Sequence, residues 1–339
     1  MNYRNRRILV FVLLVLVLAL AIPTVLANGP QKSRPESVRF ATFNASLNRF
    51  NEGDLADELA NPGSDQPDVI AEIIQRTRPD VLLINEFDYD ANGAAAQDFQ
   101  DYYLSVAHDD AEPIYYPYHY VAPSNTGIPS GHDFDKDGST TGPGDAFGFG
   151  FFPGQYGMAV YSMYPIDFDN VRTFQYFLWK DMPGAMLPID PVTGEFWYDD
   201  GDLEIFRLSS KSHWDVPIEI SGKTVHFLVS HPTPPVFDGE EDRNGTRNND
   251  EIRFWADYII PSRSSYIYDD EGQYGGLEPG AMFVIAGDQN SDPFDGDSVP
   301  GAIQQLLDHP LVNTKDTPDS EGAVEQSILQ NDINDTHIG

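Results

Sequence analysis

Three apolar runs in this sequence end in residues that can take part in metal or phosphate chemistry. One run leads to Glu86, and carboxylate oxygen is a ligand that Mg²⁺ and Ca²⁺ prefer. Another leads through Gly287, which permits a tight turn, to Asp288 and Asn290, which can orient a water and hold a phosphate oxygen. A third ends at His231, whose imidazole can give or take a proton near neutral pH. Taken singly, an acidic loop, a polar turn and a strand-end histidine are also ordinary structural features.

The elements that must position these residues follow from hydrophobic spacing. Alternating or continuous apolar runs predict strands, and apolar residues three or four positions apart predict helices. The predicted strands are 38–43, 81–84, 158–161, 225–230 and 282–286, and the predicted helices are 68–76, 249–260 and 302–307. Long loops rich in Gly, Pro and Asp are predicted at 122–155 and 232–248. Strands punctuated by helices predict an α/β layered domain, with the polar residues at the strand ends.

The motifs at these strand ends resemble those of the endonuclease/exonuclease/phosphatase superfamily, the deoxyribonuclease-like phosphoesterases. The resemblance covers nearly the whole chain after its N-terminal segment. Each motif is weak by itself, but five of them in the family's order form a specific pattern. The five motifs are Thr42–Asn44, Pro79–Glu86, Tyr156–Ile166, Ser230–His231 and Gly287–Asn290.

The resemblance implies a fold, a reaction and a role for each residue. The fold would be an α/β four-layer sandwich of two packed, mainly antiparallel sheets flanked by helices. The reaction would be attack of water on a phosphoester, with Mg²⁺, or Mn²⁺ or Ca²⁺ in its place, stabilising the developing charge. By this resemblance Glu86 binds the metal, and Asn44 supports the metal or the phosphate. His231 polarises the phosphate or assists proton transfer, Asp288 orients or deprotonates the water, and Asn290 holds a phosphate oxygen.

Three further residues are candidates for binding phosphate. Arg243 and Arg247 follow His231 in a chain that is poor in basic residues, and a guanidinium binds phosphate oxygens well. The alternative is that both arginines pair with neighbouring acids and cap the following helix. Tyr156 opens the motif that resembles the family's central strand, and we include it with the two arginines.

A short acidic segment predicts a structural Ca²⁺ site. Asp133, Asp135 and Asp137 have the D-x-D-x-D-G spacing that folds carboxylates around Ca²⁺ with the glycine at a sharp turn. The twelfth position of such a loop, usually Glu, is Gly144 here, and Asp145 comes next. The alternative is a solvated acidic turn without an ion.

The N-terminal segment has the layout of a secretory signal peptide. Arginines precede the apolar run Ile8–Ile22, and small and apolar residues follow Pro23. We predict a signal peptide over 1–27, a polar leader over 28–37 and the phosphoesterase-like domain over 38–339. The protein would then be secreted, periplasmic or held at the cell surface, with no stable membrane span after cleavage. An uncleaved anchor is the alternative, because the apolar run is about long enough to cross a bilayer.

Charge and cysteine content restrict the partners. The formal net charge is −34, and it becomes −37 without residues 1–27, which hold three arginines and no acidic residue. Affinity for nucleic-acid backbones comes largely from Lys and Arg, so we expect no strong binding to duplex nucleic acid. The chain has no cysteine, which excludes disulfides and thiolate metal sites. We expect a monomer that acts on a phosphoester whose class stays open between nucleic acid, lipid headgroup and small molecule.

The C-terminal end departs from the family pattern. We find neither a closing strand that carries Asp nor the family's following Asp-His motif, and Asp308-His309 sits at a helix end rather than after a strand. We therefore expect a domain that lacks its last strand or strands, because of truncation or loss, and little or no activity from this chain. The rival hypothesis is a non-catalytic, calcium-binding exported module that retains the fold.

Overall fold

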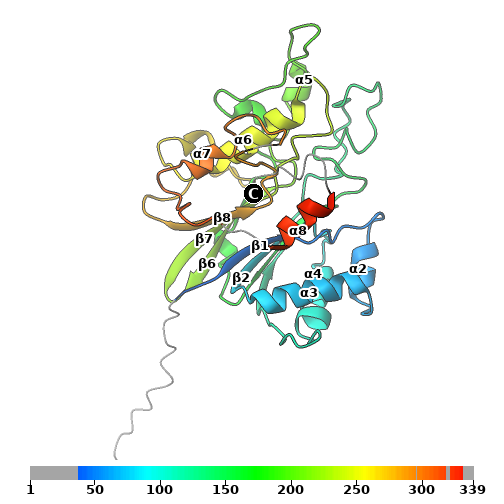
Figure 1. Cartoon of the computed structure of the whole chain (residues 1–339). Helices are drawn as coiled ribbons and strands as arrows, with labels where there is room; N and C mark the ends of the chain where they lie inside the picture. Colours follow the sequence, from blue (N-terminus) through cyan, green and yellow to red (C-terminus); the bar gives the residue numbers. More distant parts are fainter. Residues whose placement is uncertain (1–36, 295, 318–320, 331–339) are drawn as a thin grey trace, which may run out of the picture. The chain divides into compact units, whose positions relative to one another are not determined.

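The computed structural model describes residues 37–294, 296–317 and 321–330 (Figure 1). The signal peptide predicted over 1–27 lies outside these residues, as does nearly all of the polar leader. Within the ranges described, no helix is both long and apolar enough to cross a membrane.

The first sheet carries two of the residues singled out above at one of its ends. Its strand order is β1-β2-β4-β3, with β1 Phe40–Asn44, β2 Val81–Asn85, β4 Met158–Ser162 and β3 Tyr118–Tyr120. β1 and β2 are parallel, and the other two pairings are antiparallel. Asn44 lies opposite Asn85, so Asn44 and Glu86 stand at the same end of neighbouring strands.

The second sheet also carries two of the predicted site residues, His231 and Asp288, at one of its ends. Its order is β5-β6-β7-β8, with β5 Arg172–Thr173, β6 His213–Ile220, β7 Lys223–Ser230 and β8 Met282–Gly287. β6 and β7 form a hairpin whose two-residue turn, Ser221 and Gly222, has positive φ at both positions, as tight hairpins favour. β7 and β8 are parallel, with Ser230 opposite Gly287. His231 and Asp288 therefore leave the sheet side by side.

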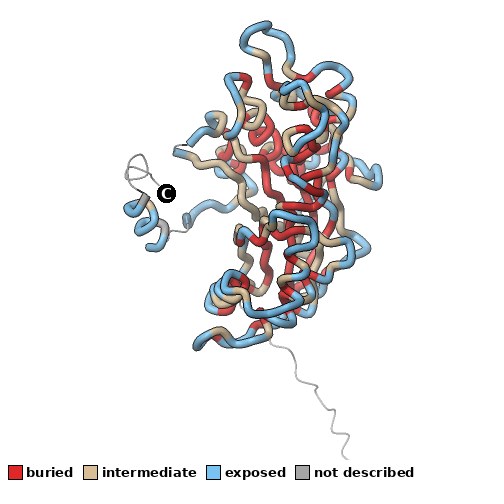
Figure 2. Tube along the Cα trace, turned by 90° about the vertical axis from the view of Figure 1, so that its right-hand side faces the viewer, coloured by how far each residue is buried: buried red, intermediate tan, exposed pale blue. Residues whose placement is uncertain are grey.

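The two sheets pack face to face through alternate residues of their strands. Val81 and Leu83 of β2 lie in one core with Phe227 and Val229 of β7, and Trp214 of β6 joins them. All five side chains are fully buried, and each such burial contributes about 1.5–3 kcal/mol. Buried residues run through the interior of the domain, between exposed outer segments (Figure 2).

The opposite faces of the same strands are covered by helices. Leu82 and Ile84 of β2 pack beneath α2, α3 and α4, and Leu228 of β7 packs beneath α6 and α7. Figure 1 shows these two groups of helices on opposite sides of the paired sheets. The order helix, sheet, sheet, helix is the predicted four-layer α/β sandwich. These helices are α2 Asp54–Leu59, α3 Asp65–Thr77, α4 Ala94–Phe99, α6 Arg243–Tyr258 and α7 Gln304–Leu307.

Shorter elements complete the domain. They are the α-helices α5 Asp200–Leu203 and α8 Glu321–Gln330, a π-helix Gln100–Leu104, and 3₁₀ turns at Phe168–Asn170, Trp179–Asp181 and Ser264–Tyr266. Among the described residues, β1 and β8 each have a neighbouring strand on one side.

The predicted start of one helix near the site is wrong. The loop predicted over 232–248 is wrong in its second part, because α6 begins at Arg243 rather than near Asn249. The first turns of α6 bury polar residues, Arg247 and Asn248 among them, so hydrophobic spacing does not reveal them. The strand β6 was also missed, since buried polar residues such as His213 and Asp215 interrupt its apolar pattern.

Candidate active site

Residues from both sheets meet at the shared ends of β1, β2 and β8. The Nδ2 of Asn44 donates to Glu86 Oε1 at 2.9 Å and to Asp288 Oδ2 at 3.0 Å. Asn48 Nδ2 donates to the other oxygen of Glu86, at 2.8 Å. One amide group therefore stands between two carboxylates that would otherwise repel each other.

This arrangement fits a divalent cation. The positive end of the Asn44 amide dipole already lies where both carboxylates favour positive charge. Glu86 and Asp288 would hold the ion, and rotation of the Asn44 amide would present its oxygen as well. Such oxygen donors suit Mg²⁺, Mn²⁺ or Ca²⁺.

His231 lies beside this group of side chains. Its Nε2 is 3.8 Å from Asp288 Oδ2, and its ring is buried. Burial, and then the charge of Lys211, lower the pKa of His231 well below its usual range, so the imidazole is neutral at pH 7. Its Nδ1 has no hydrogen-bond partner among the described residues. A neutral imidazole can accept a proton or donate its N–H.

Lys211 contributes a positive charge that the sequence did not suggest. It stands two residues before β6, and it is 7% exposed. Burial lowers its pKa, while the charges of Glu251, Glu86 and Asp288 act in the opposite direction. An ammonium group in this position can bind an anionic phosphoester. No local pattern points to Lys211, because the strand that follows it was not predicted from the sequence either.

Glu86, Lys211 and His231 line one cavity of about 780 Å³. The strand ends supply its polar side, and the loops around 134–149 and 233–244 supply the remaining walls. Eight of the residues predicted for the site are on its surface: Glu86, Asp135, Asp137, Tyr156, His231, Arg243, Arg247 and Asn290. Asn44, Asp133 and Asp288 are not among its lining residues, although Asn44 and Asp288 are hydrogen-bonded to one another beside Glu86.

The family assignment comes from the sequence profile of the Endonuclease/Exonuclease/phosphatase family, which matches residues 41–333. The chain belongs to this family. No curated protein sequence matches it.

The solved structures with a similar fold have low sequence identity to this chain. An endonuclease/exonuclease/phosphatase from Beutenbergia cavernae shares 17% identity at a TM-score of 0.41; the match covers 79% of this chain and 52%, about half, of that one. A beta toxin mutant from Staphylococcus aureus with bound magnesium ions shares 15% at 0.40, over 81% and 71% of the two chains. Sphingomyelinase C from Streptomyces griseocarneus shares 16% at 0.39, over 83% and 72%.

The backbone around the cavity of this family member is strained. Glu86, Tyr156, Phe237 and Asn290 all line the cavity with φ between 49° and 67°, a region that residues other than glycine rarely adopt. Such residues cost about 1–3 kcal/mol each and cluster at functional sites, although asparagine tolerates the region better. Gly287 is required for a related reason, because a Cβ there would lie 1.9 Å from the carbonyl oxygen of Ser230.

The two arginines differ in what their guanidinium groups do. Arg243 lines the cavity, pairs with Glu241 and lies over the Trp197 ring, 5.7 Å from its centroid. Arg247 is buried, and its Nε and one terminal nitrogen donate to the carbonyl oxygens of residues 147, 207 and 208. These bonds hold the wall of the cavity together, so a supporting role fits Arg247 better than the phosphate contact expected for it.

Glu251 of α6 fixes the two segments that present Lys211 and His231. Its Oε1 accepts from the backbone N–H of Ser210 at 2.6 Å, and its Oε2 accepts from the N–H of Thr233 at 2.7 Å. The carboxylate is buried, and burial raises its pKa. No local pattern indicates these two contacts, because they join residues 41 and 18 positions apart.

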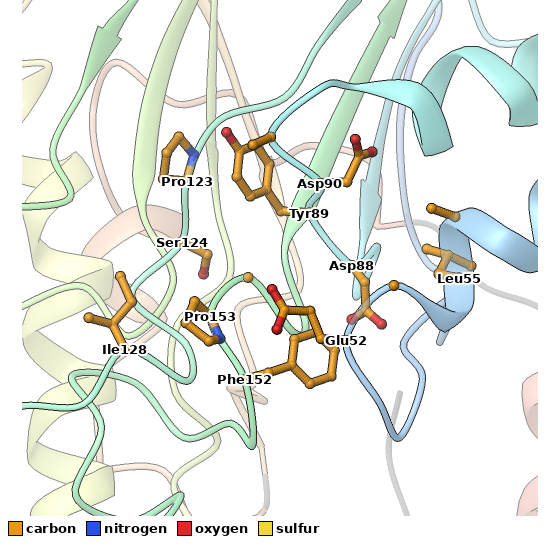
Figure 3. A pocket seen from close by; sticks show the side chains of 14 residues that line it. Glu52, Leu55, Asp88, Tyr89, Asp90, Pro123, Ser124, Ile128, Phe152 and Pro153 are labelled. Atoms are coloured by element: carbon orange, nitrogen blue, oxygen red, sulfur yellow. The ribbon is translucent and has the colours of Figure 1, made fainter.

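Asp88 performs a similar task behind Glu86. It accepts from the backbone N–H of Arg49 at 2.6 Å and of Tyr156 at 3.0 Å, and burial raises its pKa to about 6. It also borders a separate cavity of about 350 Å³, whose lining includes Glu52 and Phe152 (Figure 3). Glu86, His231 and Asn290 line the larger cavity and not this one.

The predicted acidic loop converges. One carboxylate oxygen from each of Asp133, Asp135 and Asp137 lies within 4.8 Å of the others. His309, in contrast, is absent from the residues that line the large cavity; its nearest charged neighbours are Arg263 and Asp257.

Proposed function

We propose that this protein is an exported, divalent-metal-dependent phosphoesterase that hydrolyses a phosphodiester or phosphomonoester by attack of water. The observation that supports this most is the bridging of Glu86 and Asp288 by one Asn44 amide, beside a neutral His231 at the floor of a large cavity. Membership of the family supports the hydrolase class, because the matched region includes all of these residues.

Each of these side chains would have its own role in the reaction. A divalent ion held by Glu86 and Asp288 would stabilise the charge that develops on the phosphate. Asp288 orients a water for attack and accepts its proton, a task for which a carboxylate beside the reacting group is suited. Lys211 and Asn290 hold phosphate oxygens, and Asn290 is positioned by its own bonds to Asp288 and to the carbonyl of Pro232. His231 donates an Nε2–H hydrogen bond to the phosphate, or relays a proton to the leaving group by accepting one at Nδ1 as it gives one up at Nε2.

The cavity favours a substrate with an organic group attached to its phosphate. Phe134, Phe149, Phe206 and Phe237 line it together with the polar residues of the strand ends. Aromatic walls contribute affinity for an apolar substituent. The net charge of −34 disfavours duplex nucleic acid as the substrate. We therefore propose a small-molecule or lipid phosphoester, which the predicted signal peptide would place outside the cytoplasm.

Hydrolysis of chromogenic phosphoesters tests the proposal. The full chain would be assayed with p-nitrophenyl phosphate and bis(p-nitrophenyl) phosphate in Mg²⁺, Mn²⁺ or Ca²⁺, and again in EDTA. We expect weak turnover that requires a metal, and a further loss of about 10²-fold or more in Glu86→Gln and in Asp288→Asn. The exposed Glu278→Gln is a matched control that should keep the full rate.

Two outcomes contradict the proposal. Equal rates in the control and in both site variants would remove the assigned roles. Absence of turnover on both esters with every metal, in a folded chain that still binds Ca²⁺, would favour the non-catalytic calcium-binding module instead.

A further inference from the structure

The acidic loop lies on the wall of the catalytic cavity. Asp135 and Asp137 line it directly, as do residues 141–146 of the returning chain. The mechanism proposed above makes no use of this loop. Its three carboxylates, from Asp133, Asp135 and Asp137, stand within 4.8 Å of one another without a basic side chain between them in the described structure.

A fourth carboxylate nearby supplies independent support for a bound ion. Asp145 is 2% exposed, and its Oδ1 accepts from the backbone N–H of Phe134 at 2.9 Å. Its Oδ2 is shielded from solvent and has no hydrogen-bond partner in the part of the chain that the structure describes, and Asp133 Oδ1 is in the same situation. Burial raises the pKa of Asp145, and the charges of Asp135 and Asp133 act in the same direction, so this carboxylate lies near the same group. Burying charged oxygens without partners is costly, and a cation offsets that cost.

The chain returns to the loop at the position that a calcium loop requires. In D-x-D-x-D-G loops the twelfth residue supplies the carboxylate that closes the shell of ligands around the ion. Gly144 occupies this position, and a Cβ there would lie 2.1 Å from Asp135 Oδ2. The glycine thus lets the backbone press against Asp135, and Asp145 supplies the carboxylate one residue later.

The basic residues near the loop are directed elsewhere. Lys136 Nζ lies 3.6 Å from Asp202 Oδ2, and His132 Nδ1 lies 2.8 Å from Asp202 Oδ1. Asp202 therefore anchors the start of the loop through residues 132 and 136. The carboxylates of Asp133, Asp135 and Asp137 are left facing one another.

We propose that residues 133–145 bind one Ca²⁺ through Asp133, Asp135 and Asp137, with Asp145 as the fourth carboxylate facing the ion, and that the ion neutralises the acidic wall of the catalytic cavity. Several flexible oxygen donors favour Ca²⁺ over Mg²⁺, which demands near-ideal octahedral geometry. The second half of this inference rests on the proposed function. An anionic phosphoester entering the cavity would meet the charges of Asp135 and Asp137, and the bound ion removes this repulsion.

Calorimetry with CaCl₂ tests binding separately from catalysis. The full chain would carry Glu86→Gln, so that the catalytic group has one carboxylate fewer and the loop dominates the titration. We expect one Ca²⁺ per chain, with affinity reduced by about tenfold or more in Asp135→Asn and in Asp145→Asn, the effect of losing a charged ligand. Glu278→Gln is the matched control. Because Asp145 is buried and its variant could unfold, the exposed Asp137→Asn is the second loop variant.

The results separate this inference from the proposed function. Ca²⁺ should raise the melting temperature of the control and not of the loop variants. In chains that keep Glu86, Ca²⁺ should also lower KM for the chromogenic diester by about threefold or more at low salt with Mg²⁺ in excess. The variant Asp137→Asn should abolish this effect of Ca²⁺. Unchanged calcium affinity in both Asp135→Asn and Asp137→Asn overturns the calcium site, even if hydrolysis is observed. Calcium binding that depends on the loop, in a chain that hydrolyses no phosphoester, sustains the site and overturns the proposed function.

Discussion

His213 should make the stability of the domain depend on pH. It is the first residue of β6 and is 1% exposed. Its ring lies against Phe254 and Trp255, with centroids 4.7 and 5.1 Å away. Nε2 donates to the carbonyl oxygen of Glu251 at 2.9 Å, which leaves Nδ1 to accept from the hydroxyl of Ser209 at 2.9 Å. Both contacts therefore fit the neutral ring.

The size of the effect follows from the pKa of this side chain. Burial lowers the pKa of His213 to about 4, against about 6.5 in an unfolded chain. The unfolded state binds the extra proton between these two values, so His213 contributes its full stabilisation above pH 6.5. That contribution is lost as the pH falls from 6.5 toward 4. The loss amounts to about 3 kcal/mol at pH 4.

Urea unfolding between pH 7.5 and pH 4 measures this contribution. The comparison is between the wild type and His213→Gln, in EDTA so that metal binding does not contribute. The variant should be less stable at pH 7.5, and its deficit should shrink by about 3 kcal/mol at pH 4. His132→Gln, at a side chain that is 36% exposed, controls for replacing a histidine. A deficit that stays constant across the pH range would refute the neutral, buried His213.

Three further predictions concern the site. Asn44→Ala removes the side chain that positions Glu86 and Asp288 and the amide oxygen that it could offer to the ion, so a metal titration should show activity that needs about tenfold more Mg²⁺. Lys211→Met should raise KM for an anionic phosphoester by about tenfold or more in steady-state kinetics, whereas the affinity for Mg²⁺ stays within about twofold. Gly287→Ala should lower stability by about 2 kcal/mol or more, seen as a fall in melting temperature, because φ is 148° and the new Cβ would meet Ser230.

Much of the fold, and the position of several site residues at strand ends, could be predicted from the sequence. Short apolar runs predicted β2, β4, β7 and β8 to within two residues at each end. β2 and β4 are buried along their whole length, and the second half of β7 is buried as well, which explains their nearly continuous apolar sequences. Two parallel pairings then place the residues after the strands at a common edge. The family resemblance added which of these residues belong together.

The rest of the site depends on tertiary contacts that leave no local pattern. Glu251 and Asp250 of α6 are polar, and both are buried because each reaches a distant partner; Asp250 Oδ2 accepts from Trp179 Nε1 at 2.7 Å. Hydrophobic spacing predicted the part of α6 from Asn249 onward as a helix, but it gave no sign that these acidic residues are buried, and it left the polar first turns from Arg243 as a loop. Lys211 was missed for the same reason, since its importance comes from facing carboxylates that lie far away in the sequence.

The strained residues connect the fold to the chemistry. Left-handed backbone at Glu86 turns the chain sharply at the point where β2 ends, and the same conformation recurs at Tyr156 and Asn290 around the cavity. Residues other than glycine rarely adopt this left-handed conformation on their own, so the surrounding contacts must impose it. Asp88 shows how this is done, because its buried carboxylate accepts the N–H of Tyr156 just beyond Glu86. The tightly packed cores on both faces of the sheets stabilise the domain enough to offset the backbone strain at these residues, where the reacting groups converge.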